Sequence, residues 1–320
     1  MMIEKKFLLS KKDFIPAYLK LYEKNKNLLK EKIEQGYALL KECKVCPRKC
    51  GINRLDNKSA FCRTGRYPKV SSYFLHQGEE KCLRGWKGSG TIFFAFCNLR
   101  CVFCQNYDIS WQGKNAVELK PEELAKIMIY LQKKGAHNIN FVTPEHVAPQ
   151  VIESVIVAIE LGLNIPIVYN TSAYDSEDSL MLANDIVDIY MPDFKLWDPD
   201  LSGQLLYARD YSQSARWSIK IMNCQVGPLK FDEDGIAVRG VLVRHLIMPN
   251  YIDQSKKILE FIAREVSVDT YLNIMTQYYP AGRIVFLPHK YPQLIRGITY
   301  EEYNTVMRYA KALGLYRFDI

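Results

Sequence analysis

An apolar run leads directly into three cysteines in the sequence TIFFAFCNLRCVFCQN, residues 91–106. The run 91–96 is rich in aromatic and aliphatic residues and predicts a buried strand. The cysteines after it, Cys97, Cys101 and Cys104, have the spacing C-x3-C-x2-C. In parallel α/β folds, ligands bind at the carboxyl ends of strands. The stretch therefore predicts a strand followed by a loop that wraps three thiolates around one metal centre.

Apolar runs like this one recur along the chain. Nearly continuous runs, typical of strands buried on both faces of a parallel sheet, occur at 91–96, 138–142, 165–169, 186–191, 240–248 and 270–277. Helical patterns follow at 121–134, 149–161, 176–183 and 255–266, and a closing helix is predicted at 300–313. Six β/α units in sequence predict an α/β domain whose parallel sheet is either open or closed into a barrel.

The N-terminal part has a different pattern. Apolar and charged residues alternate at helical spacing over 14–42 and predict one or two amphipathic helices. A cysteine-rich stretch with few apolar runs follows at 43–62 and predicts a loop built around a metal. We therefore expect a small helical and cysteine-rich segment over 1–85, the α/β domain over 86–290, and a C-terminal closing helix within 291–320.

Composition predicts a cytoplasmic protein. Hydrophobic residues make up 48% of the 320 residues, enough for a large core, yet no run of about 18 apolar residues is present. The N-terminus lacks the apolar region of a signal peptide, so no membrane partner is expected. Nine cysteines in the cytosol indicate metal or redox chemistry, because disulfides are rare there. The net charge of +8 comes without interleaved basic and aromatic residues, so a nucleic-acid partner is not expected.

Three thiolates suit a cluster with one open iron. A [4Fe–4S] cluster bound by three cysteines leaves its fourth iron without a protein ligand, and this open iron can bind a substrate or cofactor. The same cysteines could also form a zinc site short of one ligand, or be small buried hydrophobes. Their spacing and their position after a strand favour the cluster. Phe103, beside the last cysteine, could stack on a bound base or belong to the core.

A second cysteine group precedes the sheet, with the spacing C-x2-C-x3-C-x11-C in Cys43, Cys46, Cys50 and Cys62. Four thiolates suit a tetrahedral zinc ion or a closed [4Fe–4S] cluster. A structural zinc ion is slightly favoured over an auxiliary cluster that passes electrons, and the choice stays open. Cys82 could replace one ligand, and Cys224 is expected to be an ordinary buried thiol.

Several segments together resemble a known family. They are CNLRCVFCQNY at 97–107, VTPEH at 142–146, VYNTS at 168–172, DIYMPDFK at 188–195 and VRHL at 243–246. The first resembles the motif of the radical S-adenosylmethionine (SAM) superfamily. The set is similar to its uncharacterised pyruvate formate-lyase-activating-enzyme-like family, over about residues 43–290.

The resemblance implies a fold, two cofactors and a reaction. The fold would be a partial (β/α)6 radical SAM barrel, and Cys97, Cys101 and Cys104 would hold the [4Fe–4S] cluster. SAM would bind the open iron through its amino and carboxylate groups. An electron, supplied by a donor such as flavodoxin or ferredoxin, would cleave SAM to methionine and a 5′-deoxyadenosyl radical that abstracts hydrogen from a substrate.

Barrel geometry makes the other strand ends candidate cofactor sites as well. The candidates, in pairs along successive strands, are Thr143 and Glu145, Asn170 and Ser172, Asp193 and Lys195, and Arg244 and His245. Related enzymes have a glycine-rich turn, which binds the SAM amino group, where this chain has residues 143–145 without glycine. The plainer interpretation is that Asp193 pairs with Lys195, Asn170 caps a turn and His245 is a core histidine.

Two classes of function remain open at this point. The first is a radical SAM enzyme of unknown substrate, which would install a glycyl radical on a partner protein or modify a small molecule, a peptide or RNA. The motif Asp193-x-Lys195 resembles the Asp-x-Lys of glycyl-radical activases and favours a protein substrate. The second class is a non-catalytic iron–sulfur electron carrier or metal-stabilised binding module.

Overall fold

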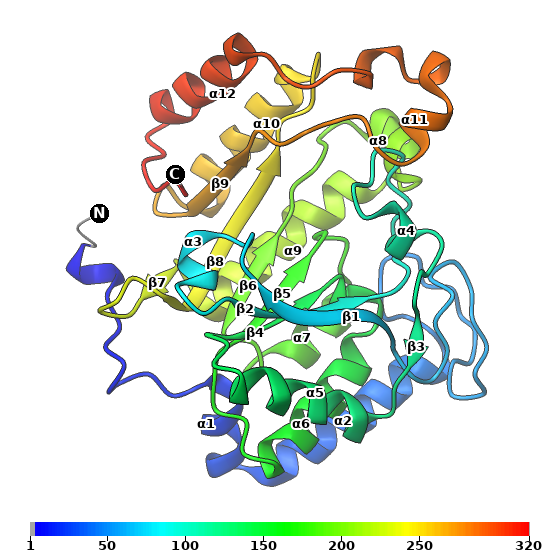
Figure 1. Ribbon diagram of the computed structural model, residues 1–320, viewed down its shortest axis with the longest axis vertical. Helices are drawn as coiled ribbons and strands as arrows, with labels where there is room; N and C mark the ends of the chain where they lie inside the picture. The colour runs from blue at the N-terminus through cyan, green and yellow to red at the C-terminus, as the bar shows by residue number, and fades with distance from the viewer. Residues whose placement is uncertain (1–3, 320) are drawn as a thin grey trace.

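A nine-stranded sheet runs through the middle of the computed structural model, which describes residues 4–319 (Figure 1). The strands are β1 (Lys69–His76), β2 (Ser89–Phe94), β3 (Val117–Glu118), β4 (Ile139–Val142), β5 (Ile167–Thr171), β6 (Ile189–Pro192), β7 (Lys230–Phe231), β8 (Ala237–Leu246) and β9 (Tyr271–Met275). Hydrogen bonds join them in the order β3-β1-β2-β4-β5-β6-β8-β7, and β9 pairs with β8.

Six of these strands form a parallel series in chain order. Parallel pairing runs from β2 to β4, β5, β6, β8 and finally β9. All six strands predicted from the apolar runs are present, each shifted by a few residues. Within the described part of the chain the first and last of them are not neighbours, so the barrel is unclosed. This arrangement confirms the predicted α/β fold with a partial (β/α)6 barrel.

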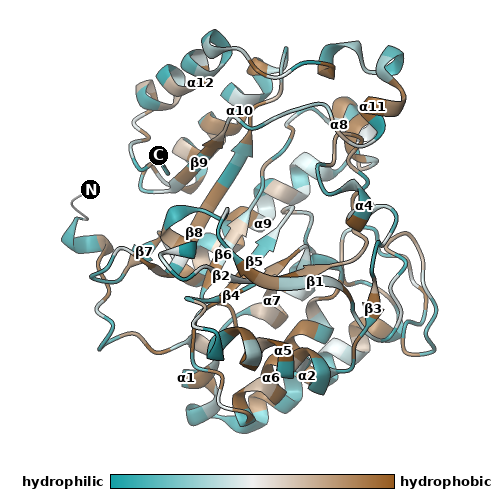
Figure 2. Cartoon of the chain, viewed as in Figure 1, coloured by the Kyte–Doolittle hydropathy of each residue, from teal (hydrophilic) through white to brown (hydrophobic). Residues whose placement is uncertain are grey.

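Helices cover the sheet. They are α1 (Ala17–Lys24), α2 (Lys26–Lys41), α3 (Lys81–Arg84), α4 (Tyr107–Ser110), α5 (Pro121–Lys133), α6 (Ala148–Glu160), α7 (Glu177–Ala183), α8 (Pro199–Leu206), α9 (Tyr211–Val226), α10 (Ile252–Phe261), α11 (Arg283–Phe286) and α12 (Tyr300–Ala312). Short helical turns are η1 (Lys5–Phe7), η2 (Pro144–His146), η3 (Ile262–Val266), η4 (Pro288–Lys290) and η5 (Pro292–Leu294). Figure 2 shows hydrophobic and hydrophilic stretches alternating along α2, α5 and α12, as expected for helices with one face on the core.

Local sequence explains where several helices begin. α5 has proline at its first position, which costs no hydrogen bond because the first N–H groups of a helix are free. The Ser176 hydroxyl accepts the Ser179 N–H and caps α7. Thr299 and Glu302 form a capping box at the start of α12. The helices predicted at 121–134, 149–161, 176–183 and 300–313 are therefore present as α5, α6, α7 and α12.

Several elements were not predicted. Strand β1 pairs antiparallel with β2, and its sequence KVSSYFLH has only one fully buried residue, so it lacks a continuous apolar run. Helices α8 and α9 fill the connection between β6 and β8, where polar residues interrupt the periodicity. Strand β1 lies within residues 1–85 but belongs to the central sheet. The domain boundary at residue 85 stays a prediction.

The segment between α2 and β1, residues 42–68, contains neither helix nor strand and carries the second cysteine group (Figure 1). Its hydrophobic residues form a small cluster of their own, centred on Leu40, Cys43 and Val45, and hydrogen bonds to His146, Ser176 and Asn98 tie the loop to the barrel. Loops of this length inside a compact domain are uncommon without a functional reason. Over residues 4–319 we find no helix whose length and hydrophobicity would let it cross a bilayer.

Candidate active site

The three-cysteine loop lies between β2 and α4 and is held by backbone hydrogen bonds from distant segments. The Val102 N–H donates to the Leu205 carbonyl at 2.9 Å, and the Val102 carbonyl accepts the Ile284 N–H at 3.3 Å. Gly282 has a φ of +57°, and a Cβ added there would lie 2.9 Å from the Val102 oxygen and 3.1 Å from the Cys104 oxygen. Glycine at 282 therefore lets the chain before α11 pack directly on the loop.

All three thiols are half-buried and have polar neighbours. The Leu99 N–H donates to Cys97 Sγ at 3.3 Å, and the Cys104 sulfur lies 3.0 Å from Ser110 Oγ. Burial raises the pKa of all three thiols, that of Cys101 to about 12. They are therefore protonated at neutral pH in the free protein, and metal binding would release their protons.

Among residues 4–319 no three cysteine, histidine or acidic side chains converge on one point as ligands of a single ion. A four-iron cluster binds each thiolate at a different iron, so its cysteines need not converge in this way.

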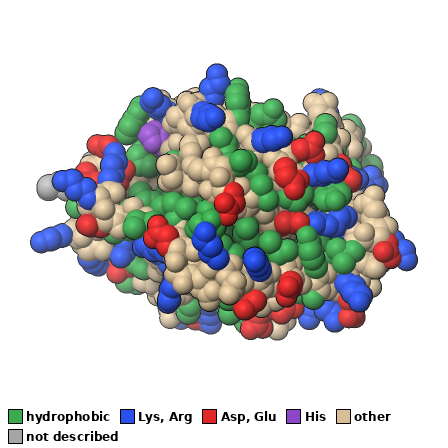
Figure 3. Space-filling model, turned by 90° about the horizontal axis from the view of Figure 1, so that it is seen from below, with side chains coloured by type: hydrophobic (Ala, Val, Ile, Leu, Met, Phe, Trp, Pro, Cys, Tyr) green, Lys and Arg blue, Asp and Glu red, His purple; other side chains and the backbone are tan. Residues whose placement is uncertain are grey.

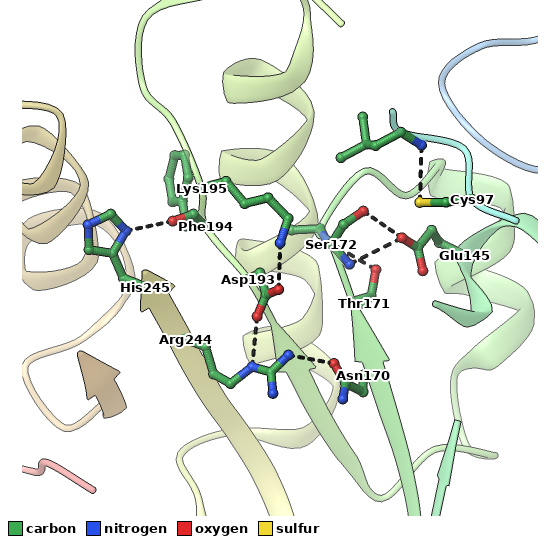
Figure 4. Close-up of polar contacts among 12 residues, drawn as sticks. Cys97, Glu145, Asn170, Thr171, Ser172, Asp193, Phe194, Lys195, Arg244 and His245 are labelled. Carbon is green, nitrogen blue, oxygen red and sulfur yellow. Dashed lines mark hydrogen bonds and ion pairs between the residues drawn. The ribbon is translucent and has the colours of Figure 1, made fainter. Parts of the chain in front are cut away.

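Glu145 carries a buried oxygen that has no partner in the described protein. Its Oε1 accepts hydrogen bonds from the Ser172 N–H at 3.2 Å and from the Ser172 hydroxyl (Figure 4). Its Oε2 is buried and makes no hydrogen bond, and burial raises the pKa of this carboxyl. A buried acceptor left without a donor is costly unless a ligand supplies one. The ammonium group of SAM would satisfy it, so the residues present fit this cofactor.

Thr143 stands at the turn where related enzymes have glycine. It has a left-handed backbone with φ of +63°, a conformation that glycine adopts at less cost, and its N–H donates to the Asn170 carbonyl at 2.8 Å. The turn shape is therefore present without the glycines, and Glu145, two residues further on, reaches Ser172.

Asp193, Lys195, Arg244 and Asn170 form one network at the ends of β5, β6 and β8 (Figure 4). Asp193 accepts from Lys195 Nζ at 2.6 Å and from Arg244 Nε at 2.7 Å, and Arg244 Nη2 donates to Asn170 Oδ1 at 2.8 Å. Burial would raise the pKa of Asp193, but Arg244 and Lys195 outweigh it and hold that pKa below its usual range. The plainer interpretation of an Asp193–Lys195 pair is thus present, as part of a larger group.

Two glutamates that the sequence analysis missed complete this network. Glu79 and Glu80 lie between β1 and α3 and reach Arg244 Nη1 at 3.4 and 3.5 Å. Glu79 also accepts from Asn140 of β4 at 2.7 Å, and Glu80 from Asn273 of β9 at 2.9 Å. The pair therefore bridges strands near the two edges of the open barrel. Burial raises the pKa of Glu79, whereas Arg244 outweighs burial at Glu80 and lowers its pKa.

Tyr211 at the start of α9 ties two strand ends together. Its hydroxyl lies 3.0 Å from the Ser172 carbonyl and 2.7 Å from the Asp193 carbonyl, and it accepts the Lys195 N–H at 2.9 Å. The side chain is fully buried. No sequence pattern announced Tyr211 or the two glutamates, because each lies outside the strands that the apolar runs predicted.

A cavity of about 240 Å³ connects the cysteines to the charged network. Its walls include Cys101, Phe103, Cys104, Asp193, Lys195 and Arg244. Phe103 is buried and lies 6.5 Å from the Tyr278 ring, centroid to centroid. A larger hollow of about 480 Å³ also borders Cys104 and is lined by Tyr107 and Phe286.

The structure does not bring His245 to this cavity. Successive side chains of a strand point to opposite faces, so His245 faces away from Arg244 (Figure 4). Its ring nitrogens lie 2.7 Å from the Phe194 carbonyl and 2.8 Å from Ser255 Oγ. Burial lowers the pKa of His245 to about 4, so the ring is neutral. This is the core histidine of the plainer interpretation.

The remaining cysteines fall into three places. Cys43, Cys46, Cys50 and Cys62 lie together in the loop 42–68, where burial raises the pKa of Cys46 to about 12 and the neighbouring Cys62 and Cys43 add to it. Cys82 is buried in α3, away from both groups, and lines a different hollow with Trp86 and Tyr271. Cys224 is exposed on α9. The expectation of a buried thiol at 224 was wrong, because this position lies on the solvent side of a helix that was not predicted.

Comparisons with known proteins agree with this geometry. The model of the Radical SAM superfamily matches residues 91–222. Uncharacterized protein MJ0674 of Methanocaldococcus jannaschii is 31% identical over 296 residues, which cover 90% of this chain and 80% of that protein. Uncharacterized protein MJ0808 of the same organism is 24% identical. That match covers 77% of this chain and 73% of MJ0808.

Solved structures give a more distant match. Streptococcus suis SuiB bound to precursor peptide SuiA has a TM-score of 0.45 and 11% identity, and the match covers 70% of this chain. This chain spans 46% of that SuiB chain.

The family match begins at Thr91, in the strand that carries the cysteine loop, and ends in α9, the helix of Tyr211. Together with the long match to MJ0674, it shows that the chain belongs to the radical SAM superfamily.

Proposed function

We propose that this chain cleaves SAM reductively at a [4Fe–4S] cluster held by Cys97, Cys101 and Cys104 and uses the resulting radical to abstract hydrogen from a substrate. Members of the superfamily are enzymes that use a [4Fe–4S] cluster and SAM. When bound, the cluster supplies the electron that splits SAM into methionine and a 5′-deoxyadenosyl radical. The observation that carries the proposal is the unpaired carboxylate oxygen of Glu145, buried near Cys97.

The surrounding residues have distinct parts in this proposal. Glu145 accepts from the ammonium group of SAM, and Ser172 fixes its other oxygen. Lys195 borders the cavity, and an ammonium group has three donors, so it can bind a carboxylate while it holds Asp193. Arg244 is committed to Asp193, Asn170 and the two glutamates, so we treat it as a positioning residue.

Release of 5′-deoxyadenosine tests the proposal. Protein reconstituted with iron and sulfide without oxygen, then reduced with dithionite, is expected to convert SAM to 5′-deoxyadenosine and methionine. Cys97→Ala, Cys101→Ala and Cys104→Ala should each abolish the product. Cys224→Ala, an exposed cysteine outside the site, is the matched control and should keep full activity. Equal turnover by all four variants would contradict the proposal.

A protein substrate is the version of this function that the surface supports. Exposed apolar side chains border the larger hollow beside Cys104: Val285 is 59% exposed and Phe286 is 68% exposed. Apolar groups left in water next to a site are typical of surfaces that bind a polypeptide. The likeness of Asp193-x-Lys195 to glycyl-radical activases favours the same class. A small acidic one-electron donor, such as flavodoxin or ferredoxin, would be the second partner.

Transfer of deuterium identifies the substrate class. Extract from cells grown in deuterated medium is separated by size, and each fraction is incubated with the reduced enzyme and SAM. We expect deuterium in 5′-deoxyadenosine only with the large fraction, and loss of this transfer after protease treatment but not after ribonuclease treatment. Transfer from the small-molecule fraction would exclude the protein substrate, while leaving SAM cleavage intact.

A non-catalytic electron carrier or metal-stabilised module is less well supported. Superfamily membership and the polar cavity beside the cysteines both favour an enzyme. An electron carrier needs neither a carboxylate acceptor nor the cationic side chains of Lys195 and Arg244 next to the iron that has no protein ligand. A cluster spectrum that does not change when SAM is added would favour the carrier.

A further inference from the structure

The loop of the second cysteine group is folded so that its four cysteines lie near one another. The Cys43 N–H donates to the Ile52 carbonyl at 2.9 Å, and the Gly51 N–H returns to the Cys43 carbonyl at 3.1 Å. This pairing brings residues 43 and 50 together, and the Lys49 N–H to the Cys46 carbonyl at 3.0 Å closes a turn between them. Cys62 is a charge neighbour of both Cys46 and Cys50. The four cysteines are therefore neighbours within one fold of the loop, although no three of their sulfurs within residues 4–319 converge as ligands of a single ion.

A buried cation beside these cysteines lacks an acidic partner. Arg54 is 1% exposed, and its guanidinium donates to the Gly65 carbonyl at 3.1 Å and the His146 carbonyl at 2.8 Å. Its Nη1 lies 4.0 Å from Cys43 Sγ, its Nη2 has no partner, and no ion pair within residues 4–319 includes it. An arginine stays charged, and a buried charge needs a counter-charge. Four metal-bound thiolates would supply that negative charge.

One side chain separates the two cysteine groups. Asn98 is fully buried; its Oδ1 lies 3.8 Å from Cys97 Sγ, and its side chain also forms a hydrogen bond with Cys46. Two arginines join the same two segments: Arg48 donates to the Asn98 carbonyl, and Arg100 Nη2 donates to the Phe61 carbonyl at 2.7 Å. The two groups are thus held next to each other, with the Asn98 amide between a sulfur of each.

We propose that Cys43, Cys46, Cys50 and Cys62 hold a second, fully thiolate-bound [4Fe–4S] cluster that passes single electrons across Asn98 to the active-site cluster. The inference rests on the proposed function, because it needs an acceptor at Cys97. A zinc ion bound by four thiolates would also neutralise the charge of Arg54. Zinc has no redox chemistry, however, and gives no reason why the second group lies against the active-site cysteines. A closed cluster with no open iron suits electron transfer.

The electron balance is simple. A low-potential one-electron donor is oxidised by one electron, and the same electron ends on the cluster at Cys97, with no proton or group transferred. Entry is expected near Cys50, the only half-exposed cysteine of the group, which follows the exposed Lys49 in a loop that also exposes Lys58 and Arg63. These cations would attract an acidic donor protein.

Metal analysis of one variant decides the identity of the second centre. The triple variant Cys97→Ala, Cys101→Ala, Cys104→Ala keeps only the second group, and reconstituted without oxygen it should retain about four irons, against about eight in the wild type. Its Mössbauer and reduced EPR spectra should show a [4Fe–4S] cluster that SAM does not alter. One zinc ion in place of iron, or no bound metal, would overturn the inference.

Electron delivery tests the relay itself. Cys50→Ser, which changes the half-exposed ligand, should lose SAM cleavage driven by reduced flavodoxin but keep cleavage driven by dithionite. In wild-type protein the two reduced clusters should broaden each other's EPR signals, and the variant should lose this broadening. Loss of cleavage with dithionite as well, in folded wild-type protein, would instead refute the proposed function. Full flavodoxin-driven activity in Cys50→Ser would overturn the relay alone.

Discussion

The two cysteine groups lie against each other but are held in place in different ways. The group at 97–104 follows a strand of the central sheet and is fixed by α8, α11 and the strand ends around it. The group at 43–62 lies in a loop without helix or strand and contacts a hydrophobic cluster of its own. We therefore expect the sheet to position the first group before any metal binds, and the second group, which lacks regular secondary structure, to rely more on its metal for stability.

Metal removal gives the largest expected difference between the two regions. Structural metal sites contribute on the order of 10 kcal/mol to folding, so chelation should open the loop 42–68. Limited proteolysis and hydrogen exchange should show new cleavage and loss of protection in 42–68, with β4, β5 and β6 still protected. A loop that stays protected without metal would show that hydrophobic contacts suffice to hold it.

Removal of Arg244 tests how much the charged network at the strand ends contributes to the stability of the barrel. Arg244→Leu leaves Glu80 as a buried charge without its cation and leaves Asp193 with Lys195 alone, which should cost about 3–5 kcal/mol in the free energy of unfolding. Urea denaturation of the metal-free protein measures this loss. The exposed ion pair of Lys220 with Glu265 provides the control, because Lys220→Ala should change stability by less than about 1 kcal/mol. Equal effects of the two changes would disprove the structural part given to Arg244.

Glu145 should affect the cofactor rather than the fold. Glu145→Gln keeps the shape but weakens the acceptor for the SAM ammonium, and a hydrogen bond to a charged group contributes about 1.5–3 kcal/mol, equivalent to a loss of affinity of about 10- to 100-fold. Equilibrium binding of SAM to the iron-loaded protein is the measurement. The cluster iron content should not change, and unchanged affinity would remove Glu145 from the SAM site.

The titration of His245 has no effect at neutral pH in this comparison and concerns the reverse face of β8. Its folded pKa of about 4 lies below that of a free histidine, so the unfolded chain takes up a proton at a higher pH than the folded one. The contribution of this residue is present above about pH 6.5 and is lost as the pH falls toward 4, by about 1.4 kcal/mol per pH unit. Stability curves of wild type and His245→Gln should converge over this range. Parallel curves would mean that His245 titrates alike in both states.

Sequence alone predicted the parts of the fold that have simple periodicity. Six apolar runs correspond to the six parallel strands, and C-x3-C-x2-C after the first strand placed the cluster loop. The antiparallel strand β1 was missed because a strand at the margin of the sheet needs no continuous apolar run. Helix α9 was missed because the polar residues Ser212 and Ser218 interrupt its buried stripe.

The site shows the same limit. Strand-end residues such as Asp193 and Arg244 were found because barrel geometry gathers strand ends. Glu79, Glu80 and Tyr211 join the site from segments outside the parallel strands, and only the folded chain brings them there. His245 shows the reverse case, because a position next to a site residue on a strand faces the other side.

Surface charge gave little information about function. On the face shown in Figure 3, basic and acidic side chains are interspersed around hydrophobic ones. Exposed basic side chains in the loop 42–68, such as Lys49, Lys58 and Arg63, account for only part of the net charge of +8. This dispersion is why net charge alone could not indicate a partner.

Anaerobic turnover is the most direct test of the central claim that Cys97, Cys101 and Cys104 form a SAM-cleaving centre. Iron-loaded, dithionite-reduced protein is mixed with SAM, and 5′-deoxyadenosine is quantified by chromatography and mass spectrometry. The account predicts product from wild type and Cys224→Ala and none from Cys101→Ala. No product from fully iron-loaded wild type, or equal product from Cys101→Ala, would contradict it.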